Sequence, residues 1–212
     1  MTNGTKGKNG NRGRPGYDLD TLLHAAAEVF HERGYDGTSM EDLAKRLGIT
    51  KSAIYYHVPS KEELLRLSVN RALDALFAIL QEHESRSGAA IDRLHHVVRR
   101  SVQVLIDEMP FVTVLLRVRG NSKVERRALA RRREFDHFVS ELVAEAEREG
   151  NVRLDVDPAL TSRLLFGMVN SLIDWYRPRK GLTRDQVADA MTAIAFDGLR
   201  APSSRTADEI PS

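Results

Sequence analysis

Apolar residues recur at intervals of three and four along most of this chain, which is the spacing of amphipathic helices. The first apolar stripe follows Asp18, a typical N-cap residue, and stops at Gly34. The second begins after Thr38 and Glu41, which have the spacing of a capping box, and stops at Gly48. The pattern therefore predicts two successive helices, the second of them short.

A very short third helix and a long fourth helix are expected next. Thr50 can cap a helix that reaches about His57, and Pro59 then breaks the chain. Ser60, with a glutamate three residues later, begins a long amphipathic stretch that we expect to end near Ser85.

Five further helical stripes follow, and we find no strand pattern and no internal repeat. The stripes cover residues 94–106, 111–118, 122–149, 158–175 and 183–199. Asp157-Pro158 is a clear start, because an N-cap residue precedes proline at the first helical position. The prediction is an all-α protein with about nine helices.

The ends of the chain differ in composition from its centre. Residues 1–17 are basic, glycine-rich and poor in apolar groups, so we predict a disordered arm there. Residues 201–212 form a polar tail that we also expect to be flexible. The helices between them divide into a small first domain, residues 18–65, and a larger second one, residues 66–200.

The composition indicates a soluble globular protein, with 42% hydrophobic and 29% charged residues. The net charge of +2 says little about partners. The absence of cysteine excludes disulfides, cysteine zinc sites and thiol nucleophiles. No apolar run approaches the roughly 20 residues of a membrane span, and no signal peptide is recognisable. We therefore expect a cytoplasmic protein with no membrane association.

Motifs of common enzyme classes are missing from the chain. It has no G-x-S-x-G, Walker loop, dinucleotide fingerprint or H-E-x-x-H. His95 and His96 are adjacent, so they cannot share one helical face as a pair of metal ligands. We expect no catalytic residue, no cofactor and no metal site.

Residues 38–64 have the residue types that a helix-turn-helix needs. Ala44 is small enough for two helices to cross closely, and Gly48 tolerates positive φ at the turn. Apolar anchors lie at suitable spacings on both helices: Leu43, Leu47, Ile49 and Ile54. A plain helical hairpin or a helical adaptor protein would explain the helices, but not the polar side chains at the start of the second one.

This segment resembles the N-terminal signature of TetR-family transcription regulators. The resemblance covers roughly residues 19–65 and rests on Thr38, Leu43-Ala44, Gly48-Ile49-Thr50, Ile54-Tyr55-Tyr56-His57, Ser60-Lys61 and Leu64. It implies a three-helix DNA-binding domain followed by a helical domain that senses a ligand and dimerises. Ser52 stands where the family often has glycine, which leaves the base contacts open, and Val58 stands where it often has phenylalanine.

The resemblance implies a role for each candidate DNA contact. Ser39 would offer its backbone N–H and its hydroxyl to a phosphate, and Thr50 would both cap the recognition helix and touch the DNA backbone. Tyr55 would divide between core packing and a phosphate contact, whereas His57 and Lys61 would bind phosphates. The candidates for base readout are Lys51, Ser52, Ala53 and Tyr56.

The N-terminal arm offers a further DNA contact. Arg12 and Arg14 place two guanidinium groups on an extended backbone, which suits a narrow A·T-rich minor groove. The alternative is an arm that only aids solubility.

A recognition helix this short buries too little surface for specific binding, so we expect a homodimer on a two-half-site operator. The stretch 158–175 is apolar on nearly every face and must be buried on more than one side. The resemblance implies that the last two long helices pair with their twofold mates. The predicted dimer contacts are Leu165, Val169, Leu172, Val187, Met191 and Ile194. The alternative is one large monomeric core.

The resemblance also implies a small-molecule effector in the second domain. The candidate cavity walls are Phe77, Leu80, Val98, Val102, Leu105, Phe111, Leu115, Phe135, Phe138 and Phe166. Asn170 is polar on a helix too apolar to be exposed, so its amide either serves the structure or orients a ligand carbonyl.

The chemistry of the effector is suggested by two stretches. Residues 166–178 resemble TetR-type regulators of fatty-acid, steroid-ring and aromatic catabolism, several of which respond to acyl-CoA thioesters. Arg117 opens a basic stretch whose density suits CoA phosphates, and which continues with Arg119, Lys123, Arg126, Arg127, Arg131, Arg132 and Arg133. The alternatives are a solvated helical face and an apolar, drug-like effector. We expect the ligand to relieve repression, although the residues do not determine the sign.

Overall fold

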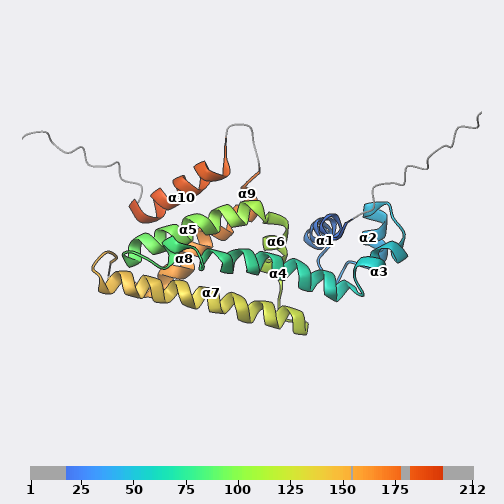
Figure 1. Cartoon of the computed structure of the whole chain (residues 1–212), viewed down its shortest axis with the longest axis horizontal. Helices are drawn as coiled ribbons and strands as arrows, with labels where there is room; N and C mark the ends of the chain where they lie inside the picture. Colours follow the sequence, from blue (N-terminus) through green and yellow to red (C-terminus); the bar gives the residue numbers. More distant parts are fainter. Residues whose placement is uncertain (1–17, 154, 178–181, 198–212) are drawn as a thin grey trace, which may run out of the picture. The chain divides into compact units, whose positions relative to one another are not determined.

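The computed structural model describes residues 18–153, 155–177 and 182–197, which form ten α-helices and one 3₁₀ turn (Figure 1). The helices are α1 (Leu19–Arg33), α2 (Met40–Leu47), α3 (Lys51–His57), α4 (Lys61–Ile79), α5 (Ala90–Asp107), α6 (Met109–Arg117), α7 (Lys123–Arg148), α8 (Pro158–Asn170), α9 (Leu172–Trp175) and α10 (Arg184–Asp197), with η1 at His83–Ser85. They divide into two units between Leu64 and Leu65, inside α4. The all-α prediction is confirmed.

The expected helix starts are confirmed at most positions, because each depends on a local hydrogen bond. The Asp18 carboxylate accepts from the Thr21 N–H at 2.8 Å, and the Thr50 hydroxyl accepts from the Ala53 N–H at 3.2 Å. Further N-caps lie at Ser122 before α7, at Asp157 before α8 and at Thr183 before α10, where Gln186 completes the box.

The predicted cap of α2 is wrong by one residue. Ser39, not Thr38, accepts the helical N–H, and Asp42, not Glu41, returns the bond to the Ser39 N–H at 2.9 Å. The reason is tertiary: the Thr38 side chain is buried and donates its hydroxyl to the Gly34 carbonyl at 2.7 Å, so it closes the α1–α2 turn instead.

Two long helices predicted from the pattern are shorter in the structure. α4 ends at Ile79, and the buried Ser85 hydroxyl donates to the Ile79 carbonyl at 2.7 Å, so the chain turns there instead of continuing to Ser85. The stretch 158–175 is divided at Ser171, whose hydroxyl donates to the Met168 carbonyl at 2.7 Å.

The first unit packs α1, α2 and the beginning of α4 around one small core, to which α3 adds a single fully buried side chain. Leu22, Ala26, Leu43 and Ile54 are fully buried in it, and Phe30 is nearly so. Gly48 turns the chain between α2 and α3 at φ 65°, a conformation that favours glycine. The predicted helix-turn-helix geometry is therefore present.

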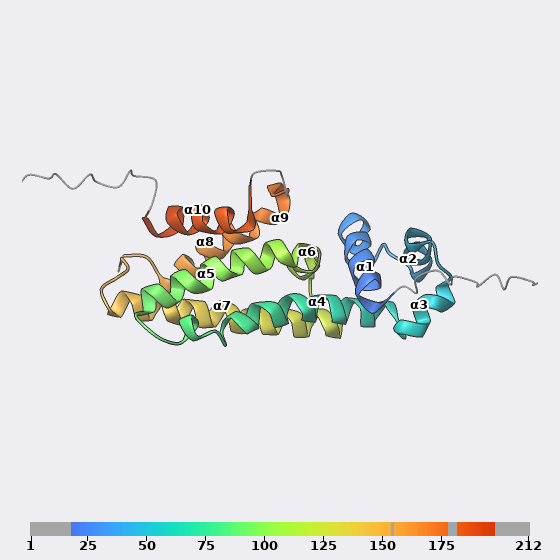
Figure 2. The same ribbon diagram turned by 45° about the horizontal axis from the view of Figure 1, so that its top comes forward.

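The second unit is built around α5, which packs against α7, α8 and α10 (Figures 1 and 2). Residues 101–105 of α5 are all buried, so this segment faces neighbours on every side. Ion pairs also attach the outer helices to α5, such as Arg99 of α5 with Asp189 of α10 at 2.8 Å. No described helix is both long and apolar enough to cross a membrane.

Candidate nucleic-acid interface and ligand pocket

The short helix α3 exposes most of its side chains. Ile54 is fully buried and anchors the helix, while Lys51, Ser52 and the two tyrosines are exposed. Tyr56 is 87% exposed and Tyr55 is 45% exposed. Tyr55 therefore does not pack in the core, which was one of its two expected roles. A water-facing row of polar and aromatic groups on an anchored helix suits contact with base edges and phosphates.

The remaining predicted contacts on α3 lie beside this row. Ala53 and His57 are half-buried. The rings of Tyr56 and His57 meet edge to face, with centroids 5.3 Å apart.

Ser39 is engaged inside the protein rather than open to a phosphate. Its N–H donates to the Asp42 carboxylate at 2.9 Å and its hydroxyl donates to the same carboxylate at 2.5 Å. These hydrogen bonds hold the pKa of Asp42 below its usual range, with the Arg33 charge adding to the effect. The N–H and the hydroxyl of Ser39, which were expected to bind DNA, thus bind the Asp42 carboxylate instead. A phosphate can contact Ser39 only if it displaces that carboxylate.

Lys61 braces the α1–α2 turn in this structure. Its ammonium donates to the carbonyls of Tyr35 at 2.8 Å and Thr38 at 2.7 Å, and it lies 4.3 Å from the centroid of the Tyr35 ring. An ammonium has three N–H donors, so one remains for the predicted phosphate contact. Arg12 and Arg14, the predicted minor-groove contacts, lie outside the described residues.

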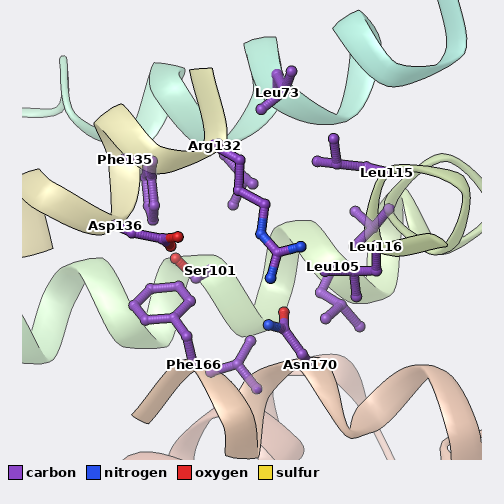
Figure 3. A pocket seen from close by; sticks show the side chains of 13 residues that line it. Leu73, Ser101, Leu105, Leu115, Leu116, Arg132, Phe135, Asp136, Phe166 and Asn170 are labelled. Atoms are coloured by element: carbon purple, nitrogen blue, oxygen red, sulfur yellow. The ribbon is translucent and has the colours of Figure 1, made fainter. Parts of the chain in front are cut away.

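The second unit holds a mostly apolar pocket between α4, α5, α6, α7 and α8 (Figure 3). Its empty space is about 480 Å³, which includes space open to solvent, and the space for the centre of a water molecule is about 30 Å³. The walls are Leu73, Leu76, Leu105, Val112, Leu115, Leu116, Phe135, Phe166 and Val169, and the polar residues are Ser101, Arg132, Asp136 and Asn170. The pocket in this state is narrow.

Only some of the predicted ligand residues line the pocket. Leu105, Leu115, Phe135, Phe166 and Asn170 line the pocket together. Phe77 does not line the pocket, but its ring centroid lies 5.9 Å from that of Phe135, which does. Elsewhere, Val102 and Phe111 are core residues, Phe138 lines a separate groove near Arg93, and Arg117 is exposed at the end of α6.

The sequence reasoning missed Ser101 and Asp136 as pocket residues, and took Arg132 only as part of a basic stretch. Ser101 had a usable signal, because it lies on the apolar stripe of α5 between Val97 and Leu105 and must therefore be buried. Asp136 had none, since it lies in a strongly charged stretch of α7.

Arg132 and Asp136 bring opposite charges to the lining of the pocket. The guanidinium of Arg132 lies in the middle, above the Asn170 amide, and the Asp136 carboxylate points toward Ser101 (Figure 3). Partial burial raises the pKa of Asp136, while the positive charges of Arg132 and Arg163 oppose the rise. Although the residue as a whole is exposed, its carboxylate is thus partly removed from water.

The basic stretch is partly committed to internal contacts. The buried Glu125 carboxylate accepts the backbone N–H groups of Arg119 and Gly120, both at 2.8 Å, so an internal anion fills the turn before α7. Arg131 pairs with Asp74 at 2.8 Å. The exposed Arg126 donates to the carbonyls of Gly120 and Asn121, both at 3.2 Å. Further basic residues of the stretch are exposed, namely Arg119, Lys123, Arg127 and Arg133.

The predicted dimer residues are mostly covered within one protomer. Four of them are buried and one, Leu165, is half-buried; the buried ones are Val169, Leu172, Val187 and Met191. These side chains can therefore add little contact area with a second protomer. Ile194 is exposed. Other large apolar side chains are exposed on the same helices or next to them, namely Leu160, Leu164, Trp175 and Leu182.

One described cluster places three potential metal ligands within 4.8 Å of one another: Glu82, Glu84 and His96. Glu82 already accepts from Arg100 at 2.9 Å and pairs with His96 Nε2 at 2.7 Å. Its carboxylate is thus occupied by an ion-pair network that attaches the turn after α4 to α5.

Two family models match this chain, one in each part. Residues 22–67 match the model described as bacterial regulatory proteins, tetR family, and residues 87–199 match the tetracyclin repressor-like, C-terminal domain. The HTH-type transcriptional repressor KstR2 of Rhodococcus jostii (strain RHA1) is 29% identical over 212 residues, covering 93% of this chain and 95% of that protein.

Two solved structures extend the comparison. SCO3833, a TetR transcriptional regulator from Streptomyces coelicolor A3, is 56% identical with a TM-score of 0.82, covering 87% of this chain and 94% of that one. AibR, solved in complex with isovaleryl coenzyme A and operator DNA, is 26% identical with a TM-score of 0.71, covering 84% and 97%.

Proposed function

This chain belongs to the TetR family of bacterial regulatory proteins, and from this premise we propose that it is a repressor that leaves its operator when a small effector binds. The observation that carries the DNA-binding part is the outer face of α3. Ile54 anchors the helix, so Lys51, Ser52 and Tyr56 face outward from a rigid support. Short and aromatic side chains held in this way can reach base edges in a major groove.

A mobility-shift experiment with DNA flanking the protein's own coding region tests this function. We expect retardation of that DNA, with an affinity that falls steeply as salt rises and that exceeds the affinity for unrelated DNA. A protein that leaves the DNA unshifted at low salt would instead be a helical adaptor. Equal affinity for every sequence would indicate an architectural DNA binder.

Two copies of α3 are needed for specific binding, because a seven-residue helix contacts few base pairs. The exposed apolar side chains on α8, α9 and α10 support a homodimer that uses these helices. Leu160, Leu164, Trp175 and Ile194 would be covered by the twofold mate, together with the adjacent Leu182. The proposed dimer contact therefore keeps Ile194 from the predicted set and replaces its buried members with exposed side chains of the same helices.

The proposed effector is an acyl-CoA thioester. The pocket combines apolar walls with a few polar groups, which suits a molecule with an apolar chain and one polar function. The similar regulator AibR was solved in complex with isovaleryl coenzyme A, and the exposed Arg119, Arg127 and Arg133 of this chain can bind CoA phosphates. An apolar, drug-like effector is the second candidate. It is favoured because nine of the residues that line the pocket are apolar and four are polar.

Coupling between the pocket and the DNA would pass through α6 and α4. Both helices line the pocket, and the Glu108 carboxylate, which begins α6, pairs with Arg71 of α4 at 2.6 Å. A movement of α6 on effector binding would therefore be transmitted to α4 through this ion pair. α4 begins at Lys61, directly after α3 in the chain. Such a coupling is typically worth about 1–3 kcal/mol.

Titration of the protein–operator complex with isovaleryl-CoA tests the effector class, with CoA alone as the control. We expect the thioester to release the operator and CoA to leave it bound. If no acyl-CoA of any chain length changes operator binding, the acyl-CoA effector is wrong, whereas the regulator function stands. Since operator binding requires access to the chromosome, we expect the protein to act in the cytoplasm.

A further inference from the structure

A buried hydroxyl in the pocket has no partner in the part of the chain that the structure describes. Ser101 is 1% exposed, lines the pocket from α5, and its Oγ makes no hydrogen bond. A buried hydroxyl without a partner costs free energy, so such a group needs an explanation. Its position in a pocket suggests that a bound molecule supplies the missing partner.

Two further hydrogen-bond donors face the same space from other helices. The Arg132 guanidinium reaches into the middle of the pocket from α7, and the Asn170 amide reaches it from α8 (Figure 3). Guanidinium and amide N–H groups donate, as does the Ser101 hydroxyl. Three donors thus lie together with one carboxylate, that of Asp136, within walls that are otherwise apolar, and the donors suit an oxygen acceptor on an apolar molecule.

The charges that line the pocket favour a neutral hydrogen-bond acceptor over an anionic one. The Asp136 carboxylate points toward Ser101 in Figure 3 and lies one helical turn from Arg132 on α7, so it partly offsets the positive charges of Arg132 and Arg163. A free carboxylate bound near Ser101 would meet the like charge of Asp136, which is partly removed from water. A neutral carbonyl oxygen would not.

We propose that this pocket binds the acyl end of a thioester, whose carbonyl oxygen accepts hydrogen bonds from Ser101, Asn170 and Arg132. The apolar walls formed by Leu105, Leu115, Phe135 and Phe166 hold the acyl chain. This assignment rests on the proposed effector-responsive function and names the residues that recognise the reactive end of the effector. Because the Arg132 side chain fills the middle of the narrow pocket, it must swing aside as the chain enters.

A comparison of two ligands that differ only at the carbonyl tests the proposal. Isothermal titration measures binding of isovaleryl-CoA and of the thioether isopentyl-CoA, in which a methylene replaces the carbonyl. We expect the wild-type protein to bind the thioester roughly tenfold more tightly, as befits the loss of hydrogen bonds to a carbonyl. Acetyl-CoA and octanoyl-CoA with their matched thioethers extend the comparison to other chain lengths.

Ser101→Ala should abolish most of this preference for the carbonyl, and Ser68→Ala is the matched control. Ser68 on α4 is the other buried serine whose hydroxyl lacks a partner among the described residues, but it does not line the pocket. Removing an unpaired hydroxyl should leave the melting temperature of either ligand-free variant unchanged or raised. Asn170→Leu provides a second variant that should reduce the preference in the same direction.

The proposal is overturned if the wild-type protein binds thioester and thioether equally, or if it binds none of the acyl-CoAs. It is also overturned if Ser101→Ala keeps the full preference, or if free isovalerate binds more tightly than isovaleryl-CoA. Operator binding by the same preparations separates this from the proposed function. A protein that shifts its operator but fails these tests is still a DNA-binding regulator, whereas one that never shifts DNA fails as a regulator whatever it binds.

Discussion

At the scale of single residues, the outer face of α3 depends on one buried side chain. A helix of seven residues makes only two turns, so the buried Ile54 determines which positions point outward. Thr50 starts the helix with its hydroxyl, and Gly48 provides the left-handed turn before it. The exposed side chains are thereby free of any role in the core, so their substitution should separate binding from stability.

Tyr56→Ala should weaken operator binding without unfolding the protein. The side chain is 87% exposed, so the melting temperature should change by no more than about 1 °C. The affinity for the operator should fall roughly tenfold while the affinity for unrelated DNA changes little, because a base contact carries sequence preference. Fluorescence anisotropy with both DNAs measures this, and a uniform loss on the two would assign Tyr56 to the phosphates.

Gly48→Ala should destabilise the first unit through backbone conformation alone. Gly48 has φ 65°, and a Cβ at this position would meet no atom within 4 Å. The cost is therefore that of a left-handed non-glycine residue, about 1 kcal/mol. Urea unfolding measures it, and Gly48→Asn should cost less because asparagine tolerates this region. Equal stability of Gly48→Ala and wild type would contradict the left-handed turn.

At the scale of elements, local caps determine where helices begin, whereas contacts between elements determine where some of them end. Ser122 starts α7 by a bond within its first turn. By contrast, α4 stops at Ile79, where Ser85 returns to bind its carbonyl, and Glu82 attaches the following turn to α5. The turn thus depends on partners that are distant from it in the sequence.

Glu82→Gln should lower stability at neutral pH but not in acid. The hydrogen bond from Arg100, aided by His96 and opposed by partial burial, lowers the pKa of Glu82 from its ordinary 4.5. A lowered acidic pKa contributes stability above the unfolded value, and this is lost as the pH falls through the folded value. Urea unfolding should show a deficit of about 1 kcal/mol at pH 7 that shrinks between about pH 5 and pH 3.

The exposed Glu84 is the matched control for this change, because it belongs to the same cluster. Glu84→Gln should have little effect at any pH. A deficit for Glu82→Gln that stays constant down to about pH 3 would mean that the ion pair with Arg100 does not stabilise the turn.

At the scale of the whole molecule, the apolar side chains left outside the protomer on α8, α9 and α10 support a twofold assembly. Leu164 is 60% exposed and Trp175 is 55% exposed, which is unusual for large apolar groups on neighbouring helices. Neither contributes to the core of a single protomer, so their burial would come from a second copy.

Leu164→Glu should therefore produce a folded monomer with weakened operator binding, since a charge would be buried at the contact. Sedimentation velocity measures the molecular mass, and circular dichroism checks the helical content. His137→Glu on the exposed face of α7 is the control, and it should remain a dimer. If Leu164→Glu is dimeric at micromolar concentration, the contact lies elsewhere.

Much of the first unit could be predicted from the sequence because its signals are local. Gly34, Gly48 and Thr50 mark ends that depend on neighbours within a few residues, and all three are confirmed. The error at Thr38 shows the limit of this reasoning. Thr38 and Ser39 are adjacent hydroxyl residues, and either could cap α2. Ser39 is the N-cap because Thr38 is buried and donates its hydroxyl to the Gly34 carbonyl.

The pocket was predicted less well, for a physical reason. An apolar residue on α5 can face the core, the pocket or a partner, and its period along the helix is the same in each case. Leu105 and Val102 carried equal signals, yet one lines the pocket and the other lies in the core. Arg132 belonged to a basic stretch that looked solvated, and only the packing of α7 on α8 turns its guanidinium inward.

The sequence by itself determined the all-α class, most helix starts and the likeness of residues 19–65 to a family of DNA-reading proteins, because caps, turns and stripes act over a few residues. Tertiary structure alone decided that Ser101, Arg132 and Asn170 meet in one pocket, that Val169 and Leu172 are covered within one protomer, and that Lys61 braces a turn. These facts depend on which helices pack together, and no local interaction along the chain encodes that choice.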